Sequence, residues 1–159
     1  MRKILISACL IGDPVRYDGQ CFDLKNVILR RWLDQGRVVS FCPEVSAGLP
    51  TPRAAAEIQG GDGKLVLSGQ VSVIDNTGVD VTNLFIKGAQ KTLAVCLENQ
   101  IDMAILSESS PSCGSSTIYN GQFEGTKITG SGVTTALLLE HGIRVFSQHQ
   151  IALAESYFE

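Results

Sequence analysis

Short apolar runs alternate with amphipathic segments along this chain. Residues 3–8 carry an Ile- and Leu-rich run before a Gly-Asp-Pro turn, and residues 37–41 carry a second apolar run before Pro43, so both are predicted to be buried strands. Between them, Asp23 is the predicted N-cap of a helix whose apolar residues keep helical spacing up to Gly36. This order predicts a strand-helix-strand unit.

The second half of the chain continues the alternation. From Asp80 the apolar positions recur on one helix face, which predicts the longest helix and places Cys96 on its buried side. The other predicted elements are strands at 103–106 and 144–146 and helices at 129–142 and 151–158.

The middle of the chain breaks this pattern. Glycine-rich residues 60–63 precede two short candidate strands, 65–67 and 71–74, which predict a small inserted hairpin. Elsewhere, buried strands alternate with helices, and right-handed crossovers then place helices on both faces of a sheet. We therefore expect a single α/β domain over residues 1–159, with an open, mostly parallel, Rossmann-like sheet.

Composition narrows the range of partners. Apolar residues make up 44% of the chain and charged residues 18%, which is typical of a folded globular protein. A net charge of -3 disfavours extended contact with nucleic acid, and no apolar run is long enough for a membrane span or a signal peptide. We expect a cytoplasmic protein with a small-molecule partner. The sequence does not decide whether its oligomeric state is a monomer or a dimer.

Three of the five cysteines follow predicted strands. Cys9 ends the first strand, Cys42 follows the second, and Cys113 lies in the Ser- and Gly-rich loop after the third. The carboxyl ends of parallel strands meet at one edge of a sheet, where ligands bind. The odd cysteine count argues against a disulfide framework, and the chain has no Cys-x-x-Cys pair.

Three converging thiolates are soft ligands that suit zinc or an iron–sulfur cluster. No fourth ligand is evident, because His141 and His149 are predicted to lie at helix ends on the surface. Three protein ligands leave one coordination position open, as catalytic metal sites require. Residue types and spacing leave the choice between the two metals open.

Several separate motifs resemble those of a bacterial family and occur in the same order as in that family. The family was long labelled a domain of unknown function, and its characterised members are thiouracil desulfidases. The motifs are Ile-Ser-Ala-Cys-Leu at 6–10, Val-Arg-Tyr-Asp-Gly at 15–19, Cys-Pro-Glu at 42–44, Gly-Leu-Pro-Thr-Pro-Arg at 48–53, Asp-Val-Thr at 80–82, Ser-Pro-Ser-Cys-Gly at 110–114 and Gly-Ser-Gly-Val-Thr at 130–134. The resemblance covers nearly the whole chain.

The resemblance implies a [4Fe-4S] cluster held by Cys9, Cys42 and Cys113, with one iron atom free to bind the sulfur of the substrate. It also implies a non-redox reaction that converts a thiolated pyrimidine, 2- or 4-thiouracil, to uracil and releases sulfide. The cluster would act as a Lewis acid toward the thiocarbonyl sulfur.

Polar residues near these motifs supply the other candidate roles. Glu44, two residues from Cys42, is the predicted general base and proton carrier. Ser110 is the predicted catalytic hydroxyl, and Ser112 is the rival hydroxyl for substrate binding, although either could instead cap the following backbone.

Two arginines are candidate substrate-binding residues. Arg16 could instead form only a turn salt bridge with Asp18. Arg53 follows two prolines, and it could anchor that loop or neutralise the negative charge of the cluster.

Two other function classes compete with this interpretation. The first is a metal-free sulfurtransferase in which Cys113 or Cys42 carries a persulfide, but it needs an activating base, and no histidine is well placed. The second is a non-catalytic module that binds a metal or a nucleotide at the sheet edge.

Overall fold

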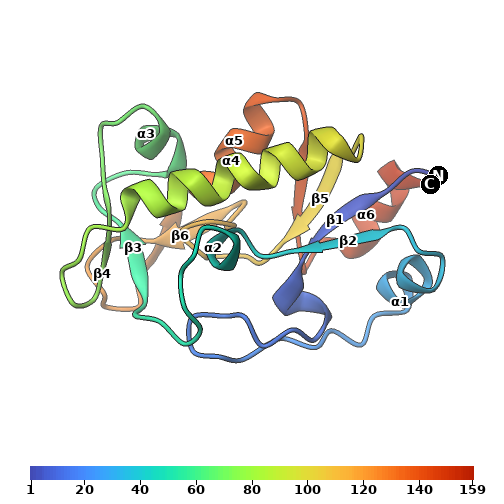
Figure 1. Cartoon of the computed structure of the whole chain (residues 1–159), viewed down its shortest axis with the longest axis horizontal. Coiled ribbons are helices and arrows are strands. Elements are labelled where there is room, and N and C mark those ends of the chain that lie inside the picture. The colour runs from blue at the N-terminus through green and yellow to red at the C-terminus, as the bar shows by residue number, and fades with distance from the viewer.

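A four-stranded parallel sheet with the order β2-β1-β5-β8 forms the centre of the computed structural model, which describes residues 1–159 (Figure 1). Its strands are β1 (Ile4–Ser7), β2 (Val38–Phe41), β5 (Met103–Leu106) and β8 (Arg144–Ser147). All neighbouring strands of this sheet pair in parallel. The predicted open parallel sheet is thus confirmed, and each of its strands lies close to a predicted one.

Helices cover both faces of the sheet, as predicted. The alternation of side chains along β1 sends Ile4 and Ile6 into a cluster with Trp32 of α1 (Val27–Asp34) and with α6 (Ile151–Phe158). Leu5 points the other way, into a cluster that contains Cys96 of α4 (Thr82–Glu98) and one residue of α5 (Val133–Glu140). Cys96 is fully buried, which confirms its predicted core position.

The connections define a switch point between β1 and β5. The chain moves from β1 through α1 to β2 at one edge, and then returns through α4 to β5 on the other side of β1. In such doubly wound sheets, ligands bind outside the carboxyl ends of the strands where the winding direction reverses. Here the backbone N–H of Ser107 donates to the Ser7 hydroxyl at 3.1 Å, which ties the two strand ends together.

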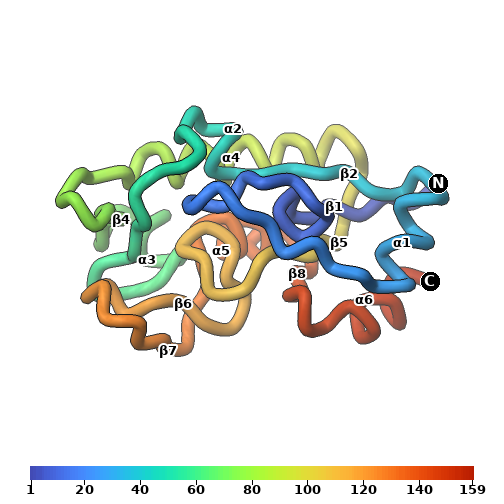
Figure 2. Tube along the Cα trace, turned by 90° about the horizontal axis from the view of Figure 1, so that it is seen from below, coloured from blue at the N-terminus to red at the C-terminus, as the bar shows by residue number.

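A smaller lobe lies beside the sheet (Figure 2). It contains the antiparallel pair β3 (Ala56–Ile58) and β4 (Val73–Asp75), the antiparallel pair β6 (Thr117–Tyr119) and β7 (Lys127–Thr129), and the short helix α3 (Gly63–Leu67). The lobe has its own apolar cluster, in which Ile58, Val66 and Ile118 pack against Phe85 of α4. The long helix α4 therefore contributes to the cores of both parts.

The predicted inserted hairpin is wrong, because its two predicted strands do not pair with each other. Residues 65–67, predicted as a strand, belong to α3, because the Asp62 side chain accepts a hydrogen bond from the Leu65 N–H at 3.2 Å and caps the helix. The strand predicted at 71–74 corresponds to β4, but it pairs with β3 rather than with residues 65–67. The β6–β7 pair was not predicted at all.

Two helix starts also differ from the prediction. Asn26, not Asp23, caps α1, and its side chain accepts from the backbone N–H groups of Ile28 and Leu29. Residues up to Thr129 belong to β7, so α5 begins only at Val133. Helical spacing reveals neither the Asn26 cap nor the hydrogen bonds from the first N–H groups of α5 to the distant carbonyls of Pro111 and Ser112.

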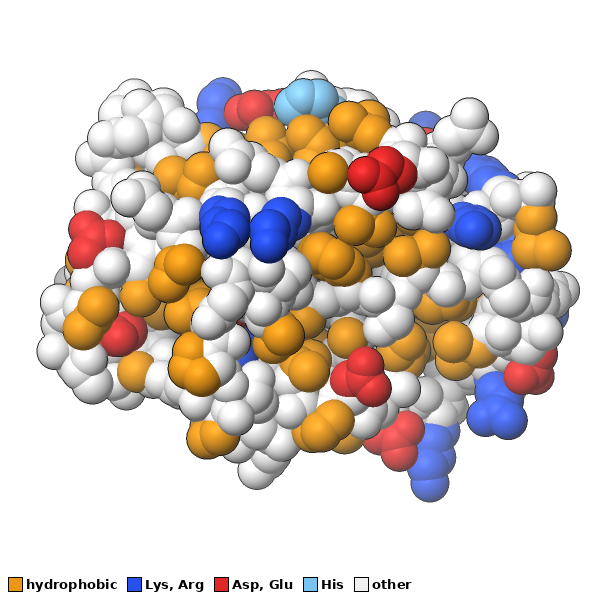
Figure 3. All heavy atoms as spheres, viewed as in Figure 1, with side chains coloured by type: hydrophobic (Ala, Val, Ile, Leu, Met, Phe, Trp, Pro, Cys, Tyr) orange, Lys and Arg blue, Asp and Glu red, His pale blue; other side chains and the backbone are white.

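None of the helices is long and apolar enough to cross a membrane. The face shown in Figure 3 mixes apolar, acidic and basic side chains, and its basic side chains do not merge into one continuous patch.

Candidate active site

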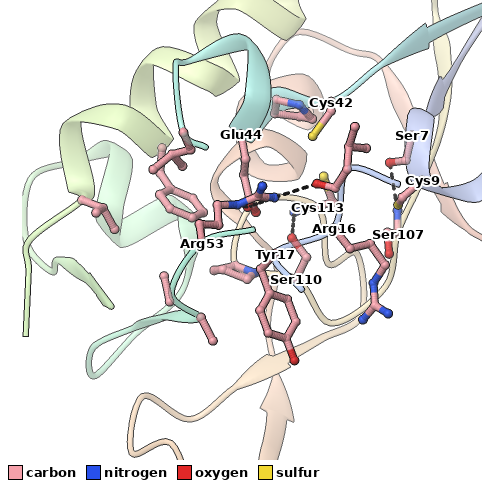
Figure 4. A pocket seen from close by; sticks show the side chains of 18 of the residues that line it. Ser7, Cys9, Arg16, Tyr17, Cys42, Glu44, Arg53, Ser107, Ser110 and Cys113 are labelled. Atoms are coloured by element: carbon pink, nitrogen blue, oxygen red, sulfur yellow. Dashed lines mark hydrogen bonds and ion pairs between the residues drawn. The ribbon is translucent and has the colours of Figure 1, made fainter. Parts of the chain in front are cut away.

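Three cysteines from three separate segments line one cavity of about 410 Å³ at the carboxyl edge of the sheet (Figure 4). Cys9 lies in η1 (Ala8–Ile11), a short 3-10 helix that directly follows β1. Cys42 directly follows β2 and is the N-cap of α2 (Pro43–Ser46). Cys113 lies in the loop between β5 and β6. The structure therefore brings together the three predicted metal ligands.

All three thiols hold their protons tightly in the metal-free protein. Burial raises the pKa of Cys9 to about 11, although a hydrogen bond with the Ser107 side chain acts in the opposite direction. Burial also raises the pKa of Cys42, and the backbone N–H of Val45 partly offsets this. The pKa of Cys113 is raised by burial first, and then by the negative charges of its neighbours. Metal binding at this site must displace protons.

The three thiols are close enough for the charge of one thiolate to raise the pKa of another. Cys42 raises the pKa of Cys9, and both raise that of Cys113. The three nonetheless do not form a group close enough to hold a single metal ion. A single zinc ion needs its thiolates at about 2.3 Å from one centre. A polynuclear cluster binds each thiolate through a different metal atom, so this wider arrangement of soft donors fits a cluster better than one ion.

Glu44 and Arg53 form a buried ion pair in the same cavity (Figure 4). Arg53 directs Nε and Nη2 at Glu44 Oε2, at 2.8 and 2.7 Å, and the two side chains are only 14% and 7% exposed for Glu44 and Arg53. The same guanidinium donates to the carbonyl oxygens of Val15 and Pro50. Glu44 Oε1 has no hydrogen-bond partner in the protein and is accessible to solvent. Glu44 is thus a fixed carboxylate with one free oxygen.

These contacts support the first of the two roles that the sequence left open for Arg53, and its charge also lowers the pKa of Cys42, in line with the second. Its donors are used by the Pro-rich loop, by Val15 and by Glu44. Arg53 therefore anchors the loop and positions Glu44. Arg16 also lines the cavity, and its guanidinium lies over the Phe22 ring at 4.2 Å and 3.8 Å from Asp18.

Of the two candidate hydroxyls, only Ser110 lines the cavity. Its Oγ accepts hydrogen bonds from the backbone N–H groups of Ser112 and Cys113, at 3.1 and 3.0 Å, so it caps the turn that carries Cys113. Ser112 is 1% exposed, and its hydroxyl is paired with Thr134 Oγ1 at 2.8 Å. The geometry favours Ser110, whose own proton remains available to a ligand.

The loop that carries Cys113 is held from two sides. Glu108 accepts hydrogen bonds from four backbone N–H groups, those of Ser109, Ser115, Ser116 and Thr117. On the other side, the first N–H groups of α5 donate to loop carbonyls, including Val133 to Pro111 at 2.8 Å. Gly132 permits this contact, because a Cβ there would lie 2.4 Å from the Ser112 carbonyl carbon.

Sequence reasoning missed several polar residues of this cavity, among them two serines and two glutamates. Ser7 and Ser107 follow the strand-end rule that identified the cysteines, so their positions could have been anticipated. Glu57 and Glu108 could not, because their roles depend on turns that have no periodic signal. The remaining cysteines, Cys21 and Cys96, do not line the cavity, and His141 and His149 are exposed as expected.

Comparisons with known proteins agree with this fold. Residues 4–150 match the family model described as 2-thiouracil desulfurase. The solved structure of the [4Fe-4S]-dependent thiouracil desulfidase TudS is 48% identical, superposes with a TM-score of 0.87, and covers 99% of both chains. YbbK of Bacillus subtilis (strain 168) is 47% identical over 148 residues, which are 93% of this chain and 97% of that protein. The chain therefore belongs to the 2-thiouracil desulfurase family.

Proposed function

We propose that this protein is an enzyme that removes sulfur from a thiolated pyrimidine, 2- or 4-thiouracil, and uses a [4Fe-4S] cluster held by Cys9, Cys42 and Cys113. The observation that carries the proposal is the meeting of three buried thiols with a fixed carboxylate in one cavity. TudS, which shares the fold over the whole chain, is described as [4Fe-4S]-dependent.

The reaction is a hydrolysis that leaves the oxidation state of the ring carbon unchanged. Water adds its oxygen to the carbon of the C=S group, the C–S bond breaks, and the two protons of water leave with the sulfide. When bound, a cluster with three protein ligands supplies a Lewis-acidic iron atom with an affinity for sulfur. The residues of the chain must then orient the ring and move the protons.

Glu44 is the proposed general base and proton carrier. Its free Oε1 accepts a proton from the attacking water and returns it to the departing sulfur, while Arg53 holds Oε2 in place. Ser110 is the proposed hydroxyl that donates to the substrate, because two backbone N–H groups fix its oxygen at the cavity wall.

The two alternative functions are less well supported. A persulfide enzyme needs a thiol with a lowered pKa and a nearby base, whereas the cysteine pKa values here are raised and no histidine lines the cavity. A pure binding module gives no role to a buried carboxylate that an arginine orients toward the cavity.

The decisive assay measures sulfide release from 2- and 4-thiouracil by anaerobically reconstituted protein. Glu44→Gln keeps the size of the side chain and removes the base, so we expect a fall in kcat of about 10²- to 10⁴-fold with the cluster retained. Full activity in the variant would show that Glu44 is not the general base. A wild-type protein that holds a cluster and releases no sulfide would overturn the proposed activity.

A further inference from the structure

Glu57 is a buried carboxylate on the side of the cavity formed by the smaller lobe. It lies in β3, it is 8% exposed, and it borders the same cavity as the cysteines. Its Oε1 accepts hydrogen bonds from the backbone N–H groups of Gly121 and Phe123, at 2.9 and 3.2 Å. Its Oε2 has no protein partner and is not sealed from solvent.

The position of Glu57 is fixed by the turn between β6 and β7. Gly121 has a φ of +91°, and a Cβ there would lie 2.6 Å from the Ile58 carbonyl oxygen. The turn therefore packs directly against β3, and only glycine permits this approach. Both N–H groups hold Oε1 and restrict the orientation of the carboxylate, and Oε2 has no protein partner on a residue that lines the cavity.

No cation of the protein neutralises Glu57. The two arginines that line the cavity are used elsewhere, since Arg53 pairs with Glu44, and Arg16 lies beside Asp18 and over Phe22. A buried carboxylate is unfavourable unless hydrogen bonds compensate for its lost hydration, and here two N–H groups hold one oxygen while the other has no protein partner and stays accessible to a ligand or to water. This arrangement is typical of a site that a ligand completes.

We infer that Glu57 Oε2 accepts a hydrogen bond from a donor group of the substrate and thereby orients the thiolated pyrimidine in the cavity; this inference rests on the proposed function. The donor is a ring N–H or a hydroxyl of a group attached to the ring. Sites built to pair with such a donor reject analogues that lack it far more strongly than apolar pockets reject a missing methylene. Glu57 is therefore a specificity-determining residue.

Glu57→Gln separates this role from support of the turn. The amide oxygen of Gln can still accept the N–H groups of Gly121 and Phe123, while its NH₂ group would face the cavity, where it opposes a substrate donor. Glu124→Gln is the matched control, because Glu124 is exposed in the same β6–β7 turn, where it accepts from Asn120.

The experiment compares wild type, Glu57→Gln and Glu124→Gln with 4-thiouracil and 4-thiouridine, by steady-state kinetics and by equilibrium binding. We expect Glu57→Gln to keep the cluster spectrum and the melting temperature, and to lower kcat/KM about 10- to 100-fold, mainly through KM. A loss with both compounds assigns a ring N–H, and a loss with the nucleoside alone assigns a sugar hydroxyl.

Unchanged Kd and KM in Glu57→Gln for both compounds would overturn the inference. A fall in kcat/KM that accompanies a loss of the cluster, or an equal fall in Glu124→Gln, would overturn it as well. If the wild type binds these compounds without releasing sulfide, the proposed activity fails, and the Kd values of the variants still decide the role of Glu57. A wild type that binds neither compound overturns both.

Discussion

Arg53 directs two donors at a single oxygen of Glu44, and the other carboxylate oxygen is left without a protein partner. Most of the surface of both side chains is buried, and the same guanidinium holds carbonyl oxygens of two loops. This geometry makes Arg53 a positioning residue for the carboxylate that we propose as the base.

Arg53→Ala is therefore expected to be strongly destabilising. Removing Arg53 leaves Glu44 and two loop carbonyl oxygens without their donor, and the loss of hydrogen bonds to a charged group costs about 1.5–3 kcal/mol. Arg30→Ala is the matched control, since Arg30 and Asp34 form an exposed pair whose loss costs at most about 1 kcal/mol. Urea unfolding of both variants measures the difference. Equal, small effects would show that Glu44 does not depend on Arg53.

Gly132→Ala is expected to displace the loop that carries Cys113. The added methyl group would meet the backbone of Ser112 and Cys113, which lies 2.4 to 2.7 Å from the position of a Cβ. Overpacking of this kind costs about 1–3 kcal/mol, and the shift should weaken cluster binding as well. Ser131→Ala, next to it in the chain, adds no atoms and serves as control. The readouts are unfolding free energy and iron content after reconstitution, and wild-type values in Gly132→Ala would contradict the role of this contact.

Glu108 gives the structure a defined response to acid. Burial alone would raise the pKa of its carboxyl, but hydrogen bonds from four backbone N–H groups outweigh it, and the pKa lies below the usual 4.5. The carboxylate therefore stabilises the fold above pH 4.5, and this contribution is lost as the pH falls through the lower pKa of the folded state.

Glu108→Ala should thus lower the unfolding free energy at pH 7 by about 1–3 kcal/mol. The difference from wild type should shrink as the medium is acidified. A difference that stays constant down to acid pH would show that the carboxylate charge is not what holds the Cys113 loop.

Alkylation of Cys9, Cys42 and Cys113 in the cluster-free protein should be slow at neutral pH and accelerate as the pH rises. The thiolate is the reactive form, and the pKa of Cys9 is raised to about 11, so its thiolate fraction grows steeply only toward that pH. Mass spectrometry of iodoacetamide-treated peptides measures the rate at each cysteine. Rapid modification of Cys9, Cys42 or Cys113 at pH 7 would instead favour the metal-free persulfide enzyme.

The sequence was most informative where one periodicity extends over a whole element. The strands β1, β2, β5 and β8 and the helix α4 all have clear apolar patterns, and the strand-end rule then placed Cys9, Cys42 and Cys113 at one edge. The smaller lobe was mispredicted because its strands are only three residues long. Such strands are defined by pairing partners distant in sequence, as with Ala56 and Asp75.

The polar residues of the site were also predicted only in part. Glu44 and Ser110 were found because they flank cysteine motifs, and both line the cavity. Ser112 was the rival candidate on sequence spacing, but the structure shows that its hydroxyl is paired with that of Thr134. Glu57 carries no motif, and its relation to the cavity depends on the packing of the β6–β7 turn against β3.

The most direct test of the central claim is the iron and sulfide content of anaerobically reconstituted variants, together with their visible absorption. Replacing Cys9, Cys42 or Cys113 singly by Ala should abolish or severely destabilise the cluster and the desulfuration activity, whereas Cys96→Ala and Cys21→Ala should retain both. A wild-type cluster in any one of the first three variants, or loss of the cluster only in Cys96→Ala or Cys21→Ala, would contradict the account.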